Sequence, residues 1–217
     1  MRGQVANVVF DLDGTLVDSL PGIETSLQWA VTHCLPGRTL SSIRDYIGPP
    51  LPTMLARFWP DLPEEELERA VATFREHYDA EGCRKSVLFP GVAQTLATLE
   101  AAGIQMFVLT NKRTRPTMKI VELTDIRRYF RAVISPDSVA PPFPTKAAGA
   151  LALRDKYGLD AAGTLLVGDG TDDGEAAAAA GFRFVAAGYG YGRAAERMEG
   201  APFAQLKTFS DLERIVL

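Results

Sequence analysis

VANVVFDLDGTLVDS, residues 5–19, is the stretch that decides the fold predicted for this chain. It begins with an apolar run, Val8-Val9-Phe10, typical of a strand that is buried on both faces. Asp11 and Asp13 follow directly. The carboxyl ends of parallel strands border the crevice where open α/β sheets bind ligands, so we expect both carboxylates to lie beside that crevice.

Two carboxylates this close together indicate a cation. They repel each other unless a cation, a shared proton or hydrogen bonds offset their charge. Oxygen ligands favour a hard cation, Mg²⁺ before any softer metal. The alternative is that Asp13-Gly14 is only turn chemistry at the end of a strand. The rest of the chain has to decide between these two interpretations.

Composition and charge restrict the class of protein. The chain has 217 residues, of which 47% are hydrophobic and 23% charged, which are ordinary globular values. Its net charge of −4 and the lack of a basic run disfavour a nucleic-acid partner. No apolar segment has membrane-spanning length and no signal-peptide pattern opens the sequence, so no membrane partner is expected. Cys34 and Cys83 are far apart, which disfavours a disulfide framework and favours the cytosol.

A small helical domain is predicted after the first strand. Helical spacing of apolar residues and Pro or Gly at the ends predict four helices there. They start at Ser19-Leu20-Pro21, at residue 40 (to 47), at residue 52 (to 58) and after Asp61. We therefore expect a helical cap domain over residues 17–85 and a core domain over residues 1–16 and 86–217.

Strands and helices alternate through the rest of the chain. Buried strands are predicted over residues 104–110, 132–135, 164–168 and 182–187. The predicted helices are 92–102, 116–123, 146–157, 172–180 and a final one over 206–217. This alternation predicts an α/β fold, a doubly wound parallel sheet with helices on both faces.

Polar and charged side chains follow the predicted strands. Thr110 and Asn111 offer a hydroxyl and an amide, which suit phosphate oxygens. Lys146 begins a helix, where an ammonium gains nothing from the helix dipole. An acidic segment, Gly168-Asp169-Gly170-Thr171-Asp172-Asp173, follows a buried strand. Each feature alone also has an ordinary explanation as turn residues, a surface lysine or helix caps.

Together these segments resemble the haloacid dehalogenase-like hydrolase superfamily, and most closely its phosphoglycolate phosphatase-like subgroup. The resemblance covers roughly residues 5–192 and implies an α/β core with a helical cap inserted after the first strand. The matching segments are DLDGTLVDS (11–19), FPGV (89–92), VLTNK (108–112), Lys146, VGDGTDD (167–173) and GYGYG (188–192).

The resemblance implies a role for each acidic residue. Asp11 would be the nucleophile and would carry an aspartyl-phosphate intermediate. Asp13 would protonate the leaving alcohol and then deprotonate the attacking water. Mg²⁺ would be held by the side chain of Asp11, the backbone carbonyl of Asp13, Asp169 and Asp173.

The resemblance also assigns the groups that bind phosphate. Thr110 and Asn111 would hold phosphate oxygens, and Lys146 would neutralise charge between the nucleophile and the phosphoryl group. Many relatives carry this lysine in a KPxP stretch, whereas residues 141–144 read PPFP here. Lys112 is the alternative, and we favour Lys146 because it lies at a helix start.

The function implied is a Mg²⁺-dependent phosphatase that acts on a small phosphorylated metabolite, with 2-phosphoglycolate as a candidate. Arg44 and the turn Gly48-Pro49-Pro50 are candidates to face the substrate, since arginine suits a carboxylate. A surface location of Arg44 is the alternative. The dehalogenases of this superfamily lack an acid two residues after the nucleophile, so Asp13 disfavours dehalogenase chemistry. Its phosphonatases use a cap lysine that forms a Schiff base with the substrate, and residues 17–84 contain no lysine, which disfavours a phosphonatase. A phosphosugar mutase of the β-phosphoglucomutase type and a non-catalytic module that binds a phosphorylated ligand remain alternatives.

Overall fold

A six-stranded parallel sheet forms the core of the protein. The structure, a computed structural model, describes residues 5–198 and 200–217. The strands lie in the order β5-β4-β1-β6-β7-β8, and each neighbouring pair is parallel. They are β1 (Asn7–Phe10), β4 (Gln105–Leu109), β5 (Phe130–Ile134), β6 (Thr164–Gly168), β7 (Arg183–Ala187) and β8 (Ala204–Leu206).

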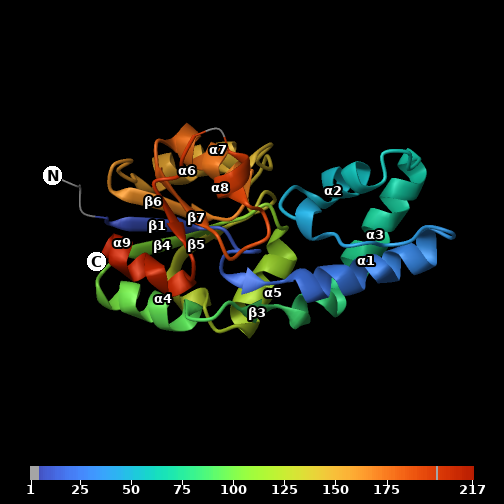
Figure 1. Ribbon diagram of the computed structural model, residues 1–217, viewed down its shortest axis with the longest axis horizontal. Coiled ribbons are helices and arrows are strands. Elements are labelled where there is room, and N and C mark those ends of the chain that lie inside the picture. The colour runs from blue at the N-terminus through green and yellow to red at the C-terminus, as the bar shows by residue number, and fades with distance from the viewer. Residues whose placement is uncertain (1–4, 199) are drawn as a thin grey trace.

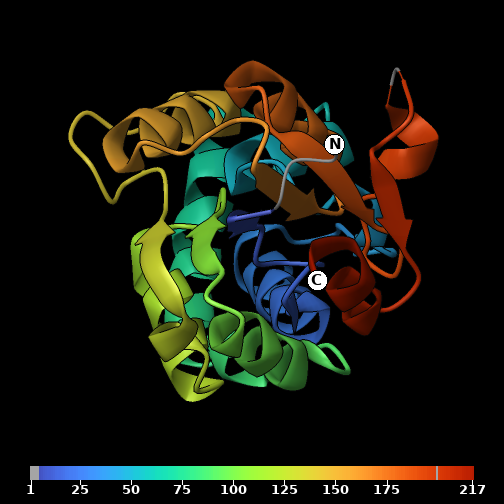
Figure 2. The same cartoon turned by 90° about the vertical axis from the view of Figure 1, so that its left-hand side faces the viewer.

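Helices cover both faces of this sheet. The side chains of β1 alternate between the two faces, and because they are apolar, each face needs helices to bury them. Val8 and Phe10 pack on the side of Leu96, and Val9 packs on the side of Leu153 and Ala176. Each fully buried Leu or Phe contributes roughly 2 kcal/mol to folding. The doubly wound α/β class predicted from the sequence is confirmed (Figures 1 and 2). One face carries α4 (Val92–Ala101), α5 (Thr114–Leu123) and α9 (Glu213–Val216), and the other carries α6 (Lys146–Tyr157), α7 (Thr171–Ala180) and α8 (Ala194–Arg197).

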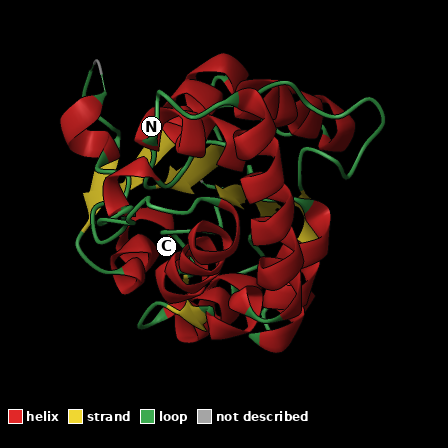
Figure 3. Cartoon of the chain, turned by 90° about the vertical axis from the view of Figure 1, so that its right-hand side faces the viewer, coloured by secondary structure: helices red, strands yellow, loops and turns green. Residues whose placement is uncertain are grey.

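A helical insert forms the second lobe of the molecule in Figure 1 and faces the viewer in Figure 3. It starts after β2 (Val17–Asp18) and ends before β3 (Val87–Leu88), and these two short strands pair antiparallel. Within it, α1 packs against α3. No helix in the described residues is long and apolar enough to cross a membrane. The insert contains α1 (Leu20–Cys34), α2 (Leu51–Phe58), α3 (Glu64–Ala80) and two 3₁₀ turns, Arg44–Tyr46 and Gly82–Lys85.

The division into two domains at residues 17 and 85 stays a prediction, and residues 1–4 of the predicted core lie outside the described residues.

The helix predicted over residues 40–47 is wrong, because only the 3₁₀ turn Arg44–Tyr46 forms there. The free-energy cost of helix nucleation exceeds the gain from the few hydrogen bonds of a short helix unless packing against the rest of the protein stabilises it. Ile43 is the buried apolar anchor of this segment, and Gly48, with φ of 129°, turns the chain away.

The final helix predicted over residues 206–217 is also too long. Leu206 ends β8, and the chain becomes helical only after Thr208. The Asp211 carboxylate accepts a hydrogen bond from the Thr208 backbone N–H at 2.9 Å and caps a 3₁₀ turn, Phe209–Leu212. This cap determines that the helical segment begins after Thr208. Leu206 stays in the sheet because β8 pairs with β7.

Candidate active site

Three buried carboxylates meet at the carboxyl end of the central strands. Asp11 follows β1, Asp169 follows β6, and Asp173 lies in the first turn of α7. Their oxygen atoms all lie within 4.8 Å of one another. The parallel register, which pairs Phe10 with Val167, brings the residues after these strands to the same edge of the sheet. The structure thus brings together the acidic residues that the sequence singled out.

The ammonium of Lys146 lies among these carboxylates. Its Nζ atom is 2.5 Å from Asp11 Oδ1, 2.6 Å from Asp173 Oδ1 and 3.6 Å from Asp172 Oδ2. Lys146 is the first residue of α6, and the hydroxyl of Thr145 caps this helix by accepting a hydrogen bond from a backbone N–H. Of the two lysines considered from the sequence, Lys146 is the one that contacts Asp11.

Burial and mutual repulsion perturb the acidic groups. Burial raises the pKa of Asp11 to about 7 although Lys146 opposes the shift, and it raises the pKa of Asp169 to about 6. Burial likewise raises the pKa of Asp173 well above its ordinary value. Burial alone would lower the pKa of Lys146, but the charges of Asp11 and Asp173 outweigh it and raise that pKa. One ammonium leaves these carboxylates with excess negative charge, and their oxygen atoms suit a divalent hard cation.

A loop rich in glycine, Gly188–Gly192, holds Asp169 in place. The backbone N–H groups of Tyr191 and Gly192 donate to Asp169 Oδ2 at 2.7 and 2.8 Å. A Cβ atom on Gly190 would overlap Asp169 Cβ and the carbonyl oxygen of Gly14. The sequence analysis named this loop only among the segments that carry the family resemblance, and it missed this role. The repeated glycines were the available signal, because close approach of backbone to a side chain favours glycine.

Replacing Gly190 with alanine is therefore expected to displace Asp169. The added methyl group has no room, and overpacking of this kind costs about 1–3 kcal/mol. We expect a lower melting temperature and weaker binding of Mg²⁺, both measurable by thermal denaturation over a Mg²⁺ titration. Unchanged Mg²⁺ affinity in Gly190→Ala would show that this loop does not set the position of Asp169.

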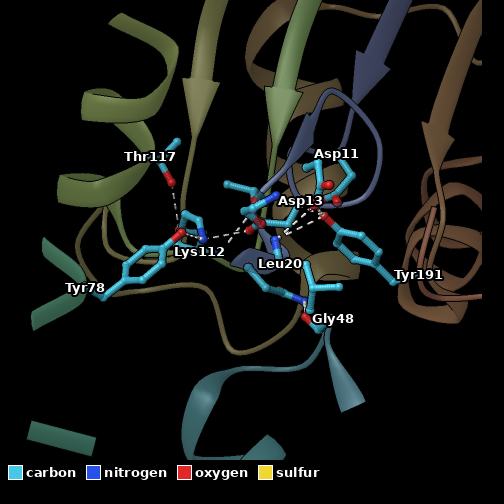
Figure 4. A network of polar contacts seen from close by, with 12 residues as sticks. Asp11, Asp13, Leu20, Gly48, Tyr78, Lys112, Thr117 and Tyr191 are labelled. Atoms are coloured by element: carbon cyan, nitrogen blue, oxygen red, sulfur yellow. Dashed lines mark hydrogen bonds and ion pairs between the residues drawn. The ribbon is translucent and has the colours of Figure 1, made fainter. Parts of the chain in front are cut away.

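Asp13 lies beside Asp11 in a separate network of polar contacts (Figure 4). The Ser19 hydroxyl donates to Asp13 Oδ1 at 2.5 Å, and Lys112 Nζ lies 3.0 Å from Asp13 Oδ2. Lys112 follows β4, and its backbone N–H donates to the hydroxyl of Thr110. The sequence offered Lys112 as an alternative partner of the nucleophile, whereas the structure places it against Asp13.

A cavity of about 150 Å³ joins these groups to the helical insert. Thr110 and Asn111 line it together with Asp11, Asp13, Lys146, Asp169 and Asp173. The Asn111 amide donates to Asp172 Oδ2 at 2.8 Å and to the carbonyl oxygen of Gly48 at 3.2 Å. The turn Gly48-Pro49-Pro50, which the sequence made a candidate to face the substrate, lines the cavity.

Arg44 lies elsewhere. Its guanidinium donates to the carbonyl oxygen of Gly190 at 3.4 Å and lies 5.3 Å from the centre of the Tyr191 ring. Arg44 does not belong to the described residues that line the cavity. The prediction that it faces the substrate placed it on a helix that does not form, so its side chain points toward the glycine-rich loop instead.

Two other arginines line the cavity and were missed. Arg113 follows β4 and donates to Asp79 Oδ1 at 2.7 Å. Arg75 lies on α3, is exposed, and has no hydrogen-bond or ion-pair partner among the residues that the structure describes. Arg75 lies on a segment typical of an ordinary surface helix, and Arg113 lies in the loop between β4 and α5, directly after Lys112. No local pattern marked either arginine as a residue of the site.

Comparisons with known proteins give one family model, several relatives and similar solved structures. The family model described as "Haloacid dehalogenase-like hydrolase" matches residues 8–187. The chain is 33% identical over 212 residues to "Phosphoglycolate phosphatase 1" of Pseudomonas aeruginosa, covering 94% of this chain and 77% of that protein. It is 35% identical over 213 residues to a phosphoglycolate phosphatase of Yersinia pseudotuberculosis, covering 96% and 91%. A crystal structure of a "predicted phosphoglycolate phosphatase" from Haemophilus somnus aligns with a TM-score of 0.85 and 28% identity over 99% of both chains.

Proposed function

The chain belongs to the haloacid dehalogenase-like hydrolase family and is a phosphoric monoester hydrolase. We propose that it is a Mg²⁺-dependent phosphatase that forms an aspartyl-phosphate on Asp11. The observation that carries this proposal is the position of Lys146, whose ammonium bridges Asp11 and Asp173 in a buried site. A cation there offsets the repulsion between an anionic nucleophile and an anionic phosphate.

In the proposed reaction, a carboxylate oxygen of Asp11 attacks phosphorus while the bond between phosphorus and the leaving oxygen breaks. Asp13 gives a proton to that leaving oxygen. Water then attacks the phosphorus of the aspartyl-phosphate while Asp13 takes a proton from this water. The bond between phosphorus and the Asp11 oxygen breaks, which releases inorganic phosphate and restores the Asp11 carboxylate. The Thr110 hydroxyl donates a hydrogen bond to a phosphate oxygen during both steps, and the Asn111 amide does so after it gives up its bond to Asp172 or to Gly48.

The residues proposed to hold the metal are Asp11, Asp169, Asp173 and the backbone carbonyl of Asp13. Buried carboxylate oxygens within 4.8 Å of one another fit a hard divalent cation. When bound, Mg²⁺ supplies positive charge that stabilises the charge developing on the phosphoryl oxygens.

We propose that the leaving group is small and carries a carboxylate, as in 2-phosphoglycolate. The cavity of about 150 Å³ is smaller than the roughly 300–1,000 Å³ of pockets that hold drug-sized ligands. Arg75 offers an unpaired charge for a carboxylate, and the remaining insert wall is largely apolar. Burying sugar hydroxyls against such a wall would cost free energy, which disfavours the mutase alternative. The insert residues on this wall are Ile23, Ile47, Gly48, Pro49, Pro50, Leu51, Pro52, Met54, Phe74, Arg75 and Tyr78.

Mg²⁺ is expected to stabilise the protein more at about pH 8 than at about pH 5.5. The pKa of Asp11 is raised from 3.8 to about 7 and that of Asp169 to about 6, so the folded metal-free protein keeps protons that the unfolded chain has lost. Stability of the metal-free protein therefore falls as pH rises from about 4 to about 7. Mg²⁺ binds the deprotonated carboxylates, so the rise in melting temperature that it causes should grow over the same range.

Thermal denaturation with Mg²⁺ or with a chelator measures this difference at each pH. Asp169→Asn serves as the control, because it removes a proposed ligand and should abolish most of the Mg²⁺-dependent shift. An equal shift at both pH values, or a larger one in acid, would contradict the proposed metal site.

The experiment that tests the function is an assay of purified protein with p-nitrophenyl phosphate and a panel of phosphorylated metabolites, with and without Mg²⁺. A phosphatase releases inorganic phosphate, a mutase yields an isomerised phosphosugar, and a binding module leaves every substrate unchanged. Phosphate release that requires Mg²⁺ and favours 2-phosphoglycolate supports the proposal. A cytosolic location, favoured by the cysteine pattern, stays a prediction.

A further inference from the structure

We infer that Lys112 is a positioning residue that fixes the orientation of Asp13 and ties this orientation to helix α3 of the insert. The inference rests on the proposed function, because it concerns the step in which Asp13 protonates the leaving oxygen. Lys146 already accounts for the cation beside the nucleophile, so the chemistry above leaves the lysine of the VLTNK segment without a role.

Lys112 contacts one residue of the core and one of the insert. Its Nζ atom lies 3.0 Å from Asp13 Oδ2 and donates to the Tyr78 hydroxyl at 2.9 Å (Figure 4). The Lys112 and Asp13 side chains are only 10% and 15% exposed. The ammonium also lies 4.6 Å from the centre of the Tyr78 ring, within cation–π distance. Such a shielded cation with two fixed partners has little freedom to move.

Both oxygen atoms of Asp13 are held. Lys112 contacts Oδ2, and the Ser19 hydroxyl donates to Oδ1 at 2.5 Å. The backbone of Lys112 is fixed as well, because its N–H donates to the hydroxyl of Thr110 and its carbonyl accepts from the hydroxyl of Thr117. The core therefore determines where the lysine side chain begins, and Asp13 and Tyr78 determine where it ends.

The end of α3 that carries Tyr78 is itself tied to the core. Arg113 donates to the Asp79 carboxylate at 2.7 Å. Lys119 donates to the backbone carbonyl oxygens of Asp79 and Ala80 at 2.8 and 3.1 Å. These cations suit the carboxyl end of a helix, where the helix dipole is negative. The position of α3 determines where the Tyr78 hydroxyl lies. Lys112 contacts both this hydroxyl and Asp13, so the position of α3 affects the orientation of Asp13.

This arrangement matters most when the leaving oxygen needs a proton. A general acid must lie within hydrogen-bond reach of the oxygen that it protonates, and a small misplacement is costly. An alkoxide leaves poorly without a proton, whereas p-nitrophenolate leaves readily as an anion. A residue that only positions Asp13 should therefore affect alkyl phosphates much more than activated aryl phosphates.

The test measures kcat/KM of Lys112→Met over a series of phosphomonoesters that runs from p-nitrophenyl phosphate to phenyl and alkyl phosphates. This parameter reports the first half-reaction, which includes departure of the leaving group. We expect kcat/KM to fall by about 100-fold or more for alkyl phosphates and by less than about tenfold for p-nitrophenyl phosphate. The plot of log kcat/KM against the pKa of the leaving group should become steeper.

Two further variants make the result decisive. Lys156→Met removes an exposed lysine that also lies near a tyrosine ring, Tyr157, but belongs to α6 and not to the contacts that join α3 to Asp13, so it should leave the slope of the parent protein unchanged. Tyr78→Phe keeps the aromatic ring and removes only the hydroxyl, so it should give an intermediate slope even if Lys112→Met does not fold.

An equal loss across the series in Lys112→Met, or a parental slope in Tyr78→Phe, would overturn the inference. If the parent protein itself hydrolyses none of these esters, the proposed function fails instead, so the two failures are distinguishable.

Discussion

Asp11→Asn is expected to abolish phosphate release, with kcat lower by about 10⁴-fold or more, as for the loss of other enzymatic nucleophiles. An amide has almost the same size as a carboxylate but lacks the anionic oxygen that would attack phosphorus. The variant should still fold. Burial raises the pKa of the Asp11 carboxyl to about 7, so replacing it with a neutral amide relieves charge repulsion at about pH 8. Phosphate release and thermal denaturation measure the two effects.

Asp172→Asn is the matched control for that variant. Asp172 also lines the cavity, but its carboxylate is 3.6 Å from Lys146 Nζ and has no role in the proposed reaction. Its loss should lower kcat by less than about tenfold, since the amide can still accept a hydrogen bond from Asn111. Activity of Asp11→Asn within tenfold of the parent protein would show that another group attacks the phosphate.

Lys146→Ala is expected to lower kcat by about 10³-fold, the size of effect seen when one preorganised positive group is lost. The substitution also removes the cation from between two buried carboxylates, Asp11 and Asp173. Breaking a buried ion pair from one side costs about 3–5 kcal/mol, so the metal-free variant should be less stable than the parent protein at about pH 8. Mg²⁺ should restore part of this stability because it brings positive charge to the same carboxylates.

Lys156→Ala is the control on the same helix. Lys156 is exposed in the last turn of α6, at the opposite end of the helix from Lys146, and lies near the Tyr157 ring, so its loss should leave kcat close to that of the parent protein. Steady-state kinetics and chemical denaturation with and without Mg²⁺ measure both effects. Near-normal kcat in Lys146→Ala would refute its proposed role as the cation beside the nucleophile.

The grouping of acidic residues could be predicted from the sequence because one physical rule governs it. Parallel strands place their carboxyl ends at the same edge of the sheet, so buried runs followed by Asp11 and Asp169 were sufficient to bring these side chains together. Lys146 was assigned through the family resemblance, and its position at the start of the helix that precedes β6 brings it to the same edge of the sheet. Alternation of strands and helices predicted the doubly wound sheet without any long-range information.

The contacts between the insert and the core could not be predicted in this way. Arg44 was expected on a helix, but the short segment around it forms only a 3₁₀ turn, which changes where its side chain points. The strands β2 and β3 are two residues long and have no periodicity to detect. The contact between Lys112 and Tyr78 joins residues 34 positions apart, and it depends on how α3 packs rather than on any local pattern.

We propose that Asp11 becomes phosphorylated beside a metal ion held by Asp169 and Asp173. The most direct measurement is a crystal structure of the protein with Mg²⁺ and beryllofluoride, which mimics a phosphoryl group on an aspartate. We predict beryllofluoride on an oxygen of Asp11, Mg²⁺ in contact with Asp11 and Asp169, and Lys146 beside the fluorides. Beryllofluoride on Asp13, or Mg²⁺ bound away from Asp169, would contradict the account.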